Sequence, residues 1–291
     1  MLSNGMKVAI IGANGQLGMD LMKAFADVDS VGLTHSDIEI CDSNSVSNAC
    51  ANLKPTIVIN TAAYHKVDDC EKDPERSFQI NALGALTLAK AAETHQFDLV
   101  HISTDYVFDG KKQAPYLEID TPRPLNVYAV TKLAGEHFIA ANTSRYYIVR
   151  SSGLYGHNVC RAKGRNFIDT MLALANNGKD IRVVRDEILT PTYTYHLAQQ
   201  IRELVSTRAY GLYHITSNGS CSWFEFAQEI FAHAGLHPNL QPTSVKEFLS
   251  PIRRPSYSVL DNAALRSLGI DYMPHWKESL AHYFSAKPVK N

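Results

Sequence analysis

The chain has 291 residues, of which 45% are hydrophobic and 20% are charged, a composition typical of a globular protein rather than a disordered one. Lys and Arg number 28 against 29 Asp and Glu, for a net charge of −1, so the sequence lacks the basic footprint of a nucleic-acid-binding protein. No apolar run reaches the roughly 18 residues of a transmembrane helix. Residues 1–4 lead directly into a strand-like stretch, so we expect no signal peptide.

The first half of the sequence alternates strand-like and helix-like segments. Lys7–Ile11 (KVAII) is a short, continuous apolar run of the kind that a strand covered on both faces requires. Further strands are predicted at 31–34, Ile57–Asn60, 99–103 and 146–150, and helices at 15–26, Ser43–Leu53, 74–95 and 126–142. This alternation predicts an α/β fold with a doubly wound parallel sheet of the Rossmann type.

After residue 150 the alternation loosens. Helices are predicted at 167–177, 195–207 and 222–234, strands at Ile181–Val184 and 212–215, and loops around Pro251 and Pro255. We therefore expect a first domain over residues 1–150 and a smaller C-terminal α/β domain, which covers the substrate, over 151–291. The boundary between them is expected to interleave.

The cysteines argue against a disulfide framework and against a structural zinc site. They are odd in number and form no CxxC pair, which favours a reducing, cytoplasmic location. The five are Cys41, Cys50, Cys70, Cys160 and Cys221.

A glycine motif follows the first predicted strand directly. Gly12, Gly15 and Gly18 form a GxxGxxG pattern at the start of a predicted helix. A pyrophosphate needs a tight turn, bare backbone and close helix–strand packing at the positive end of a helix, and glycine supplies these because it has no Cβ. The first domain is thus predicted to bind NAD or NADP. The second strand ends at Thr34 and His35, without an Asp or Arg that would choose between the two.

A second constellation combines Tyr128 and Lys132, in a YxxxK pattern, with the hydroxyl of Thr104. Four residues apart on a helix places the phenol and the amine on one face, where an ammonium favours the phenolate and so eases proton transfer. Thr104 follows a predicted strand at its carboxyl end, where ligands sit in open α/β sheets. These three residues are candidates for catalysis at a carbonyl oxygen.

Other polar and aromatic groups have simpler interpretations. Asp68, Asp69 and Glu71 are read as a solvated turn or a helix start, and Trp223 as a core residue. The histidines show no metal-ligand spacing.

With these motifs in hand, the sequence resembles the extended short-chain dehydrogenase/reductase superfamily and, more narrowly, the dTDP-4-dehydrorhamnose reductase family. The resemblance covers nearly the whole chain, and the segments STDYVFDG and PLNVYAVTKLAGE are its most specific parts. The matching segments are GANGQLG at 12–18, LKPTIVINTAAY at 53–64, VDDCE at 67–71, STDYVFDG at 103–110, PLNVYAVTKLAGE at 124–136, NFIDTML at 166–172, TPTYTYHLA at 190–198, GLYHITSNGSCSWFEFA at 211–227 and RPSYSVLDN at 254–262.

The resemblance implies an NADPH- or NADH-dependent enzyme of dTDP-rhamnose synthesis that reduces the C4 ketone of a dTDP-sugar, and it suggests a homodimer. The implied catalytic residues are Tyr128, Lys132 and Thr104. The implied cofactor contacts are Gly12, Asn14, Gly15, Gln16, Leu17, Gly18, Glu39, Ile40, Ala62, Ala63, Tyr64, Tyr128 and Lys132. The implied substrate contacts are Val67, Thr104, Asp105, Tyr106 and, for a phosphate, Arg254.

Two departures from the family pattern bear on function. Gly153 stands where the family usually has a tryptophan near the sugar, which leaves the identity of the hexose open. Some members hold an inter-subunit Mg²⁺ with glutamates; Asp20 could stand for one, but Tyr195 and His196 occupy positions where an acid would be wanted, so we predict no metal site.

Three alternatives to this activity remain. They are a reductase of another dTDP-4-keto-6-deoxysugar, an epimerase that keeps its NAD, and a non-catalytic dinucleotide-binding regulatory subunit like that of methionine adenosyltransferase.

Overall fold

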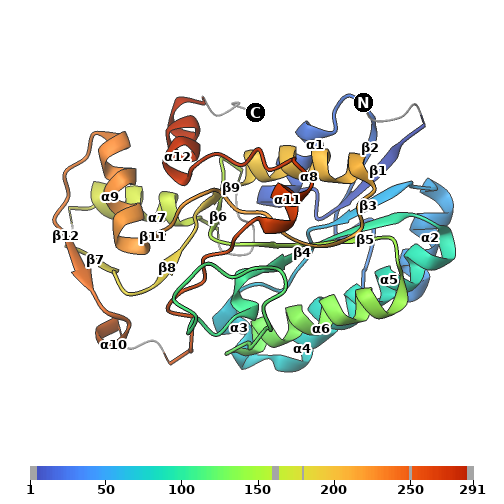
Figure 1. The fold of residues 1–291 in the computed structure, drawn as a ribbon, viewed down its shortest axis with the longest axis horizontal. Coiled ribbons are helices and arrows are strands. Elements are labelled where there is room, and N and C mark those ends of the chain that lie inside the picture. Colours follow the sequence, from blue (N-terminus) through green and yellow to red (C-terminus); the bar gives the residue numbers. More distant parts are fainter. Residues whose placement is uncertain (1–4, 159–163, 179, 249–250, 287–291) are drawn as a thin grey trace.

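A six-stranded sheet, parallel throughout, forms the centre of the molecule (Figure 1). The computed structural model describes residues 5–158, 164–178, 180–248 and 251–286. In sheet order the strands are β10 (Gly211–His214), β5 (Tyr146–Ser151), β4 (Asp98–Thr104), β3 (Ile57–Asn60), β1 (Lys7–Ile11) and β2 (Asp29–Leu33). The predicted Rossmann-type fold is confirmed.

Helices cover both faces of the sheet because both faces of its strands are apolar. On β1, Val8 and Ile10 pack on one face, and Ala9 and Ile11 on the other, as the two-residue repeat of a strand requires. One layer contains α1 (Gln16–Ala24) and α8 (Thr194–Thr207); the other contains α2 (Ser43–Leu53), α5 (Gly84–His95) and α6 (Val127–Asn142) (Figure 1). Full burial of each Val, Leu or Ile side chain contributes roughly 1.5–3 kcal/mol.

The second half of the chain interleaves with the first. Helix α8 packs on α1, and β10 extends the sheet beside β5. Most of the remaining elements gather beside the sheet around a core of their own that includes Phe226, Trp276 and Tyr155 (Figure 1). They are β6 (Leu154–Tyr155), α7 (Phe167–Asn176), β7 (Ile181–Val184), β8 (Ile188–Leu189), β9 (Thr192–Tyr193), β11 (Cys221–Ser222), α9 (Trp223–Ala234), β12 (Leu240–Thr243), α10 (Val245–Phe248) and α12 (Trp276–Ser285). Helix α11 (Ala263–Ser267) packs on β10, with Leu265 in the core of the central sheet. The domain limits 1–150 and 151–291 stay a prediction.

The helical stretch predicted over residues 74–95 is confirmed, although one turn within it is not α-helical. The segment divides into α4 (Pro74–Phe78), a π-helical turn η1 (Gln79–Leu83) and α5. The wider turn contains Asn81, whose buried amide bonds both backbone groups of Tyr64: Tyr64 N–H donates to Oδ1 at 2.9 Å, and Nδ2 donates to the Tyr64 carbonyl at 2.9 Å. Single π turns of this kind are frequent at functional sites.

A short helix α3 (Val67–Lys72) follows β3 and contains Asp68 and Asp69 in its first turn, so the helix-start interpretation of these acids is confirmed. Carboxylates are favourable at this end of a helix. Among the described residues, none of the helices is both long and apolar enough to cross a bilayer. Four cysteines are free, and the fifth, Cys160, lies outside the described residues.

The contact between α6 and η1 yields a test of the fold. A Cβ on Gly135 of α6 would lie 2.4 Å from the carbonyl oxygen of Asn81, which is backbone and cannot rotate away. We expect Gly135→Ala to lower the free energy of unfolding in urea by about 1–3 kcal/mol, as overpacking does, although Ala is the better helix former.

Gly84→Ala is the matched control. A Cβ there would meet the end of the Ile40 side chain at 2.9 Å, and that side chain can move, so the loss should be clearly smaller. Equal losses in both variants would show that the close approach of α6 to η1 does not constrain the fold.

Candidate active site

A cavity of about 490 Å³ opens at the carboxyl ends of the central strands, where ligands bind in open α/β sheets. Its walls come from the β1–α1 loop, the loop after β3, the end of β4, α6 and several segments of the second half. The cavity is lined by Gly12, Asn14, Gly15, Gln16, Leu17, Thr61, Ala62, Ala63, His65, Val67, Ile102, Ser103, Thr104, Asp105, Tyr106, Tyr128, Lys132, Ser151, Gly153, Leu154, Arg165, Asn166, Phe167, Glu187, Ile188, Leu189, Thr194, Trp223, Pro255 and Ser258.

The glycine loop has the shape that a dinucleotide pyrophosphate needs. Gly12 has φ +79°, and a Cβ on Gly18 would lie 2.1 Å from the Gly12 carbonyl oxygen, so only glycine lets α1 approach the loop this closely. The first turn of α1 has no side-chain cap, which leaves its N–H groups and the positive end of the helix facing the cavity. Gln16 Nε2 is buried, has no hydrogen-bond partner within the described part of the chain, and adds a further donor. The loop fits a bound pyrophosphate.

Two side chains fix the start of α6 beside the cavity. Asn126 caps the helix by accepting the Ala129 N–H at 2.9 Å, and Glu71 of α3 accepts the Val127 N–H at 2.8 Å. Tyr128 therefore lies in the first turn and Lys132 one turn later, on the same face.

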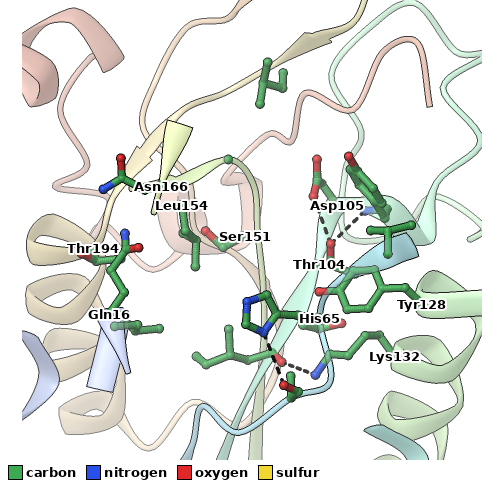
Figure 2. Close-up of a pocket in the computed structure, with 18 of the residues that line it drawn as sticks. Gln16, His65, Thr104, Asp105, Tyr128, Lys132, Ser151, Leu154, Asn166 and Thr194 are labelled. Atoms are coloured by element: carbon green, nitrogen blue, oxygen red, sulfur yellow. Dashed lines mark hydrogen bonds between the residues drawn. The ribbon is translucent and has the colours of Figure 1, made fainter. Parts of the chain in front are cut away.

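The Tyr128 hydroxyl points into the cavity, between Thr104 and Lys132 (Figure 2). Burial raises the pKa of Tyr128 well above its ordinary value of 10, and a hydrogen bond with Thr104 offsets this in part. Burial therefore keeps the phenol protonated, which is the form that can donate a proton.

Lys132 is 1% exposed and has no carboxylate partner of its own among the residues that the structure describes. Its Nζ donates to the Ile102 carbonyl at 2.6 Å, and the neighbouring acid on α6, Glu136, is paired with Arg150. Burial lowers the pKa of Lys132 to about 8, although Glu136 opposes this shift. A lysine with this pKa exchanges its proton readily near neutral pH.

Asp105 lies beside Thr104 in the short 3₁₀ turn η2 (Asp105–Val107) that follows β4. Its carboxylate accepts from Thr104 Oγ1 at 3.1 Å and from Ser152 Oγ at 2.8 Å. Burial raises the pKa of Asp105 to about 6, against hydrogen bonds from Ser258, Ser152 and Thr104 that lower it.

Most of the residues singled out from the sequence line this cavity, and five do not. Gly18 lies beneath the glycine loop, and Ile40 is buried against Gly84. Glu39 pairs with His35 at 3.3 Å. The Tyr64 ring stacks with the Arg76 guanidinium, and Arg254 pairs with Asp68 at 3.7 Å. Their assigned contacts with cofactor or substrate stay predictions.

The structure adds residues that the sequence patterns did not indicate. Asn166 and Thr194 face Tyr128 and Lys132 from across the cavity, on the same side as the predicted Gln16 (Figure 2). Trp223, interpreted as a core residue, is half-buried, lines the cavity and packs on Phe167 with ring centroids 4.6 Å apart. Such residues come from loops and from the second half, where short strands give little periodicity to read.

Neighbouring side chains hold the Asp20 carboxylate. Its carboxylate accepts from Thr194 Oγ1 at 2.6 Å and from Asn158 Nδ2 at 2.9 Å. Within the described parts of the chain, no three side chains of His, Cys, Asp or Glu gather as metal ligands would.

Comparisons with known proteins place nearly the whole chain in one family. A family model described as "RmlD substrate binding domain" matches residues 6–288. A crystal structure of dTDP-4-dehydrorhamnose reductase from Bacillus anthracis, in complex with NADP, superposes with a TM-score of 0.92 at 40% identity, over 96% of this chain and 99% of that one. The chain belongs to the dTDP-4-dehydrorhamnose reductase family. This is a family of oxidoreductases, so the resemblance noted in the sequence is confirmed.

Relatives within the family differ in name. The chain is 38% identical to the spore coat polysaccharide biosynthesis protein SpsK of Bacillus subtilis, over 97% of this chain and 98% of that protein. It is 34% identical to a dTDP-4-keto-6-deoxy-D-glucose reductase of Streptomyces niveus, over 94% and 95%. The family is therefore established by these matches, and the sugar is not.

The raised pKa of Asp105 predicts a pH-dependent stability. A carboxyl group with a higher pKa in the folded state than the unfolded value of 3.8 stabilises the fold while protonated. That contribution is complete below pH 4 and is lost as pH rises through about 6. About two pKa units correspond to about 3 kcal/mol. In urea titrations, the free energy of unfolding should therefore fall less between pH 4 and 7 in Asp105→Asn than in the wild type.

Asp109→Asn serves as the control, because it removes a half-buried carboxyl from the same segment. Its free energy of unfolding should change with pH as in the wild type. Parallel pH profiles for wild type and Asp105→Asn would contradict the assignment.

Proposed function

We propose that this protein reduces the C4 ketone of dTDP-4-dehydro-L-rhamnose to dTDP-L-rhamnose with NADPH or NADH. The observation that carries the proposal is the convergence of Thr104, Tyr128 and Lys132 on one cavity wall, in the same cavity as the glycine loop. A keto-sugar attached to a nucleoside diphosphate requires this combination of a proton donor and a dinucleotide site. Family membership supports the choice of substrate class.

In this proposal Tyr128 is the general acid. Its phenol donates a proton to the ketone oxygen as negative charge develops there, a contribution typically worth 10²–10⁴ in rate. The Thr104 hydroxyl, which donates to Asp105 in the free protein, turns to donate to the same oxygen, and Lys132 stabilises the phenolate that remains. The bound dinucleotide supplies the hydride.

The loop after β2 bears on the choice between NADPH and NADH. Asp37 Oδ2 accepts from the Thr34 N–H at 2.8 Å and from Thr34 Oγ1 at 2.7 Å, so this oxygen is used within the turn. The side chain of His35 is 86% exposed. This end of β2 presents an exposed histidine beside two acids, Asp37 and Glu39, so it does not choose between NADPH and NADH. The cytoplasmic location and the homodimer remain predictions.

One alternative has specific support: reduction of another dTDP-4-keto-6-deoxyhexose. Gly153, where the family usually has a tryptophan, has φ +56°, and a Cβ there would lie 2.8 Å from Leu189 Cδ1 and 3.1 Å from the Pro191 Cα. A tryptophan is therefore excluded from this backbone, and Leu154 lines the cavity instead. The sugar-facing wall thus differs from the family pattern.

A coupled assay distinguishes these substrates. dTDP-4-keto-6-deoxyglucose is supplied with and without the 3,5-epimerase that precedes this step in rhamnose synthesis, and loss of NADPH or NADH absorbance is followed in parallel. Oxidation only with the epimerase supports the rhamnose precursor, and equal oxidation without it supports the alternative. No oxidation with either sugar, together with copurification of a partner enzyme, would support a regulatory subunit instead.

For the chemistry itself, we expect Tyr128→Phe to lower kcat by about 10²–10⁴ at saturating substrate, because the phenyl ring keeps its packing and loses its proton. Tyr210→Phe, which removes a hydroxyl that bonds Asp98 outside the cavity, is the matched control and should keep wild-type turnover. A kcat near wild type in Tyr128→Phe would refute the assignment of the general acid.

A further inference from the structure

Behind the cavity, three polar side chains form a buried row: Asn60, His101 and Lys132. The proposed mechanism uses only Lys132. Asn60 at the end of β3 and His101 on β4 are register partners on adjacent strands, and Lys132 faces them from α6. Each is 1% exposed. Asn60 Nδ2 lies 3.1 Å from His101 Nδ1, and His101 Nε2 lies 3.0 Å from Lys132 Nζ.

The backbone fixes the orientation of the Asn60 amide. The Ala62 N–H, which can only donate, lies 3.1 Å from Asn60 Oδ1, so the amide oxygen must face Ala62 and the NH₂ group must face His101. An imidazole nitrogen that accepts a hydrogen bond carries a lone pair and no proton. His101 Nδ1 is therefore unprotonated, and a neutral ring carries its proton on Nε2.

The Nε2 proton points at Lys132 Nζ. An N–H group can only donate, so Nζ satisfies it only with a lone pair, which the ammonium ion does not have. We propose that Asn60 and His101 are positioning residues that bias Lys132 toward its neutral amine, by holding the imidazole in the tautomer whose Nε2–H donates to Nζ. The lowered pKa of Lys132 and that of His101, both shifted first by burial, agree with this bias.

Other titratable groups surround the row without replacing this interaction. Glu136 on α6 would favour the ammonium, but its carboxylate is committed to Arg150 of β5, with Nη2 at 2.6 Å. The side chains of Tyr128, on α6, and Asp105, in η2, share the cavity wall with Lys132, as does His65 from the loop after β3.

The remaining elements packed on α6 contribute mainly uncharged groups here. Cys70 of α3 donates to the Tyr64 carbonyl at 3.3 Å, while Ser77 of α4 and Asn81 of η1 bond Thr131.

The bias has a consequence for catalysis, which rests on the proposed function. When the Tyr128 O–H bond breaks and its proton joins the alkoxide, the phenolate can take a proton from the Lys132 ammonium, which becomes the neutral amine. His101 Nε2–H then donates to the new lone pair, without itself losing a proton. Asn60 and His101 thus stabilise the product of this transfer, and Lys132 regains its proton from water once the sugar has left.

The first test is spectroscopic and requires neither substrate nor cofactor. In the ¹⁵N-labelled protein, long-range ¹⁵N–¹H spectra distinguish protonated from unprotonated imidazole nitrogens, and the His101 signals are assigned by their loss in His101→Gln. We expect a neutral ring with the proton on Nε2 in the free protein. A proton on Nδ1, or a charged ring at pH 7, would overturn the proposal whether or not the protein reduces a sugar.

The second test is the pH dependence of kcat/KM. If the Lys132 ammonium is the active form, the rate falls as pH rises through its pKa. In His101→Gln, the side-chain oxygen can accept from the ammonium, so the alkaline limb should move up by about one pH unit or more, that is, about tenfold in proton affinity. In Asn60→Asp, a carboxylate acceptor at the same place should draw the imidazole proton to Nδ1 and move the limb in the same direction.

His137→Gln, on the exposed side of α6, is the control and should leave the profile unchanged. Variants that fold, lose activity equally at every pH and keep the wild-type limb would show a merely structural role for the row and refute the proposal. An absence of turnover in wild type with every keto-sugar would refute the proposed function and leave the spectroscopic result to decide the tautomer.

Discussion

The site depends on one constraint: the Lys132 nitrogen is buried, and none of the described residues gives it a carboxylate partner of its own. An isolated buried charge is unfavourable, so burial shifts the pKa of such a group toward its neutral form. The fold surrounds Lys132 Nζ with a backbone carbonyl and an imidazole, and it directs the nearest acid, Glu136, to Arg150. Lys132 is thereby able to give and take a proton near neutral pH, which a surface lysine does poorly.

Lys132 is buried because α6 packs closely against η1. Gly135 lets the helix approach the carbonyl oxygen of Asn81, and the side chain of Asn81 bonds both the loop at Tyr64 and the hydroxyl of Thr131. One π turn therefore sets the position of the loop that lines the cavity and of the helix that carries Tyr128 and Lys132. A change at this contact would therefore move both the loop at Tyr64 and helix α6.

The sequence indicated the strongly periodic parts of this arrangement. The apolar run at Lys7–Ile11, the glycine loop and the four-residue spacing of Tyr128 and Lys132 have local physical causes, so residue type and spacing were enough to predict them. The π turn could not be predicted, because it depends on a tertiary contact between Asn81 and Tyr64. The pairing of Asn60 with His101 depends on strand register between β3 and β4, which single-sequence patterns do not contain.

The central claim is that Lys132 exchanges its proton near neutral pH, and a direct titration tests it. With ¹³C- and ¹⁵N-labelled lysine, the Cε and Nζ resonances of Lys132, assigned by their loss in Lys132→Met, are followed from pH 6 to 11 in the protein without ligands. The account predicts a midpoint near the value of about 8 that burial imposes, against 10.5 for an ordinary lysine. A midpoint at the ordinary value would contradict it.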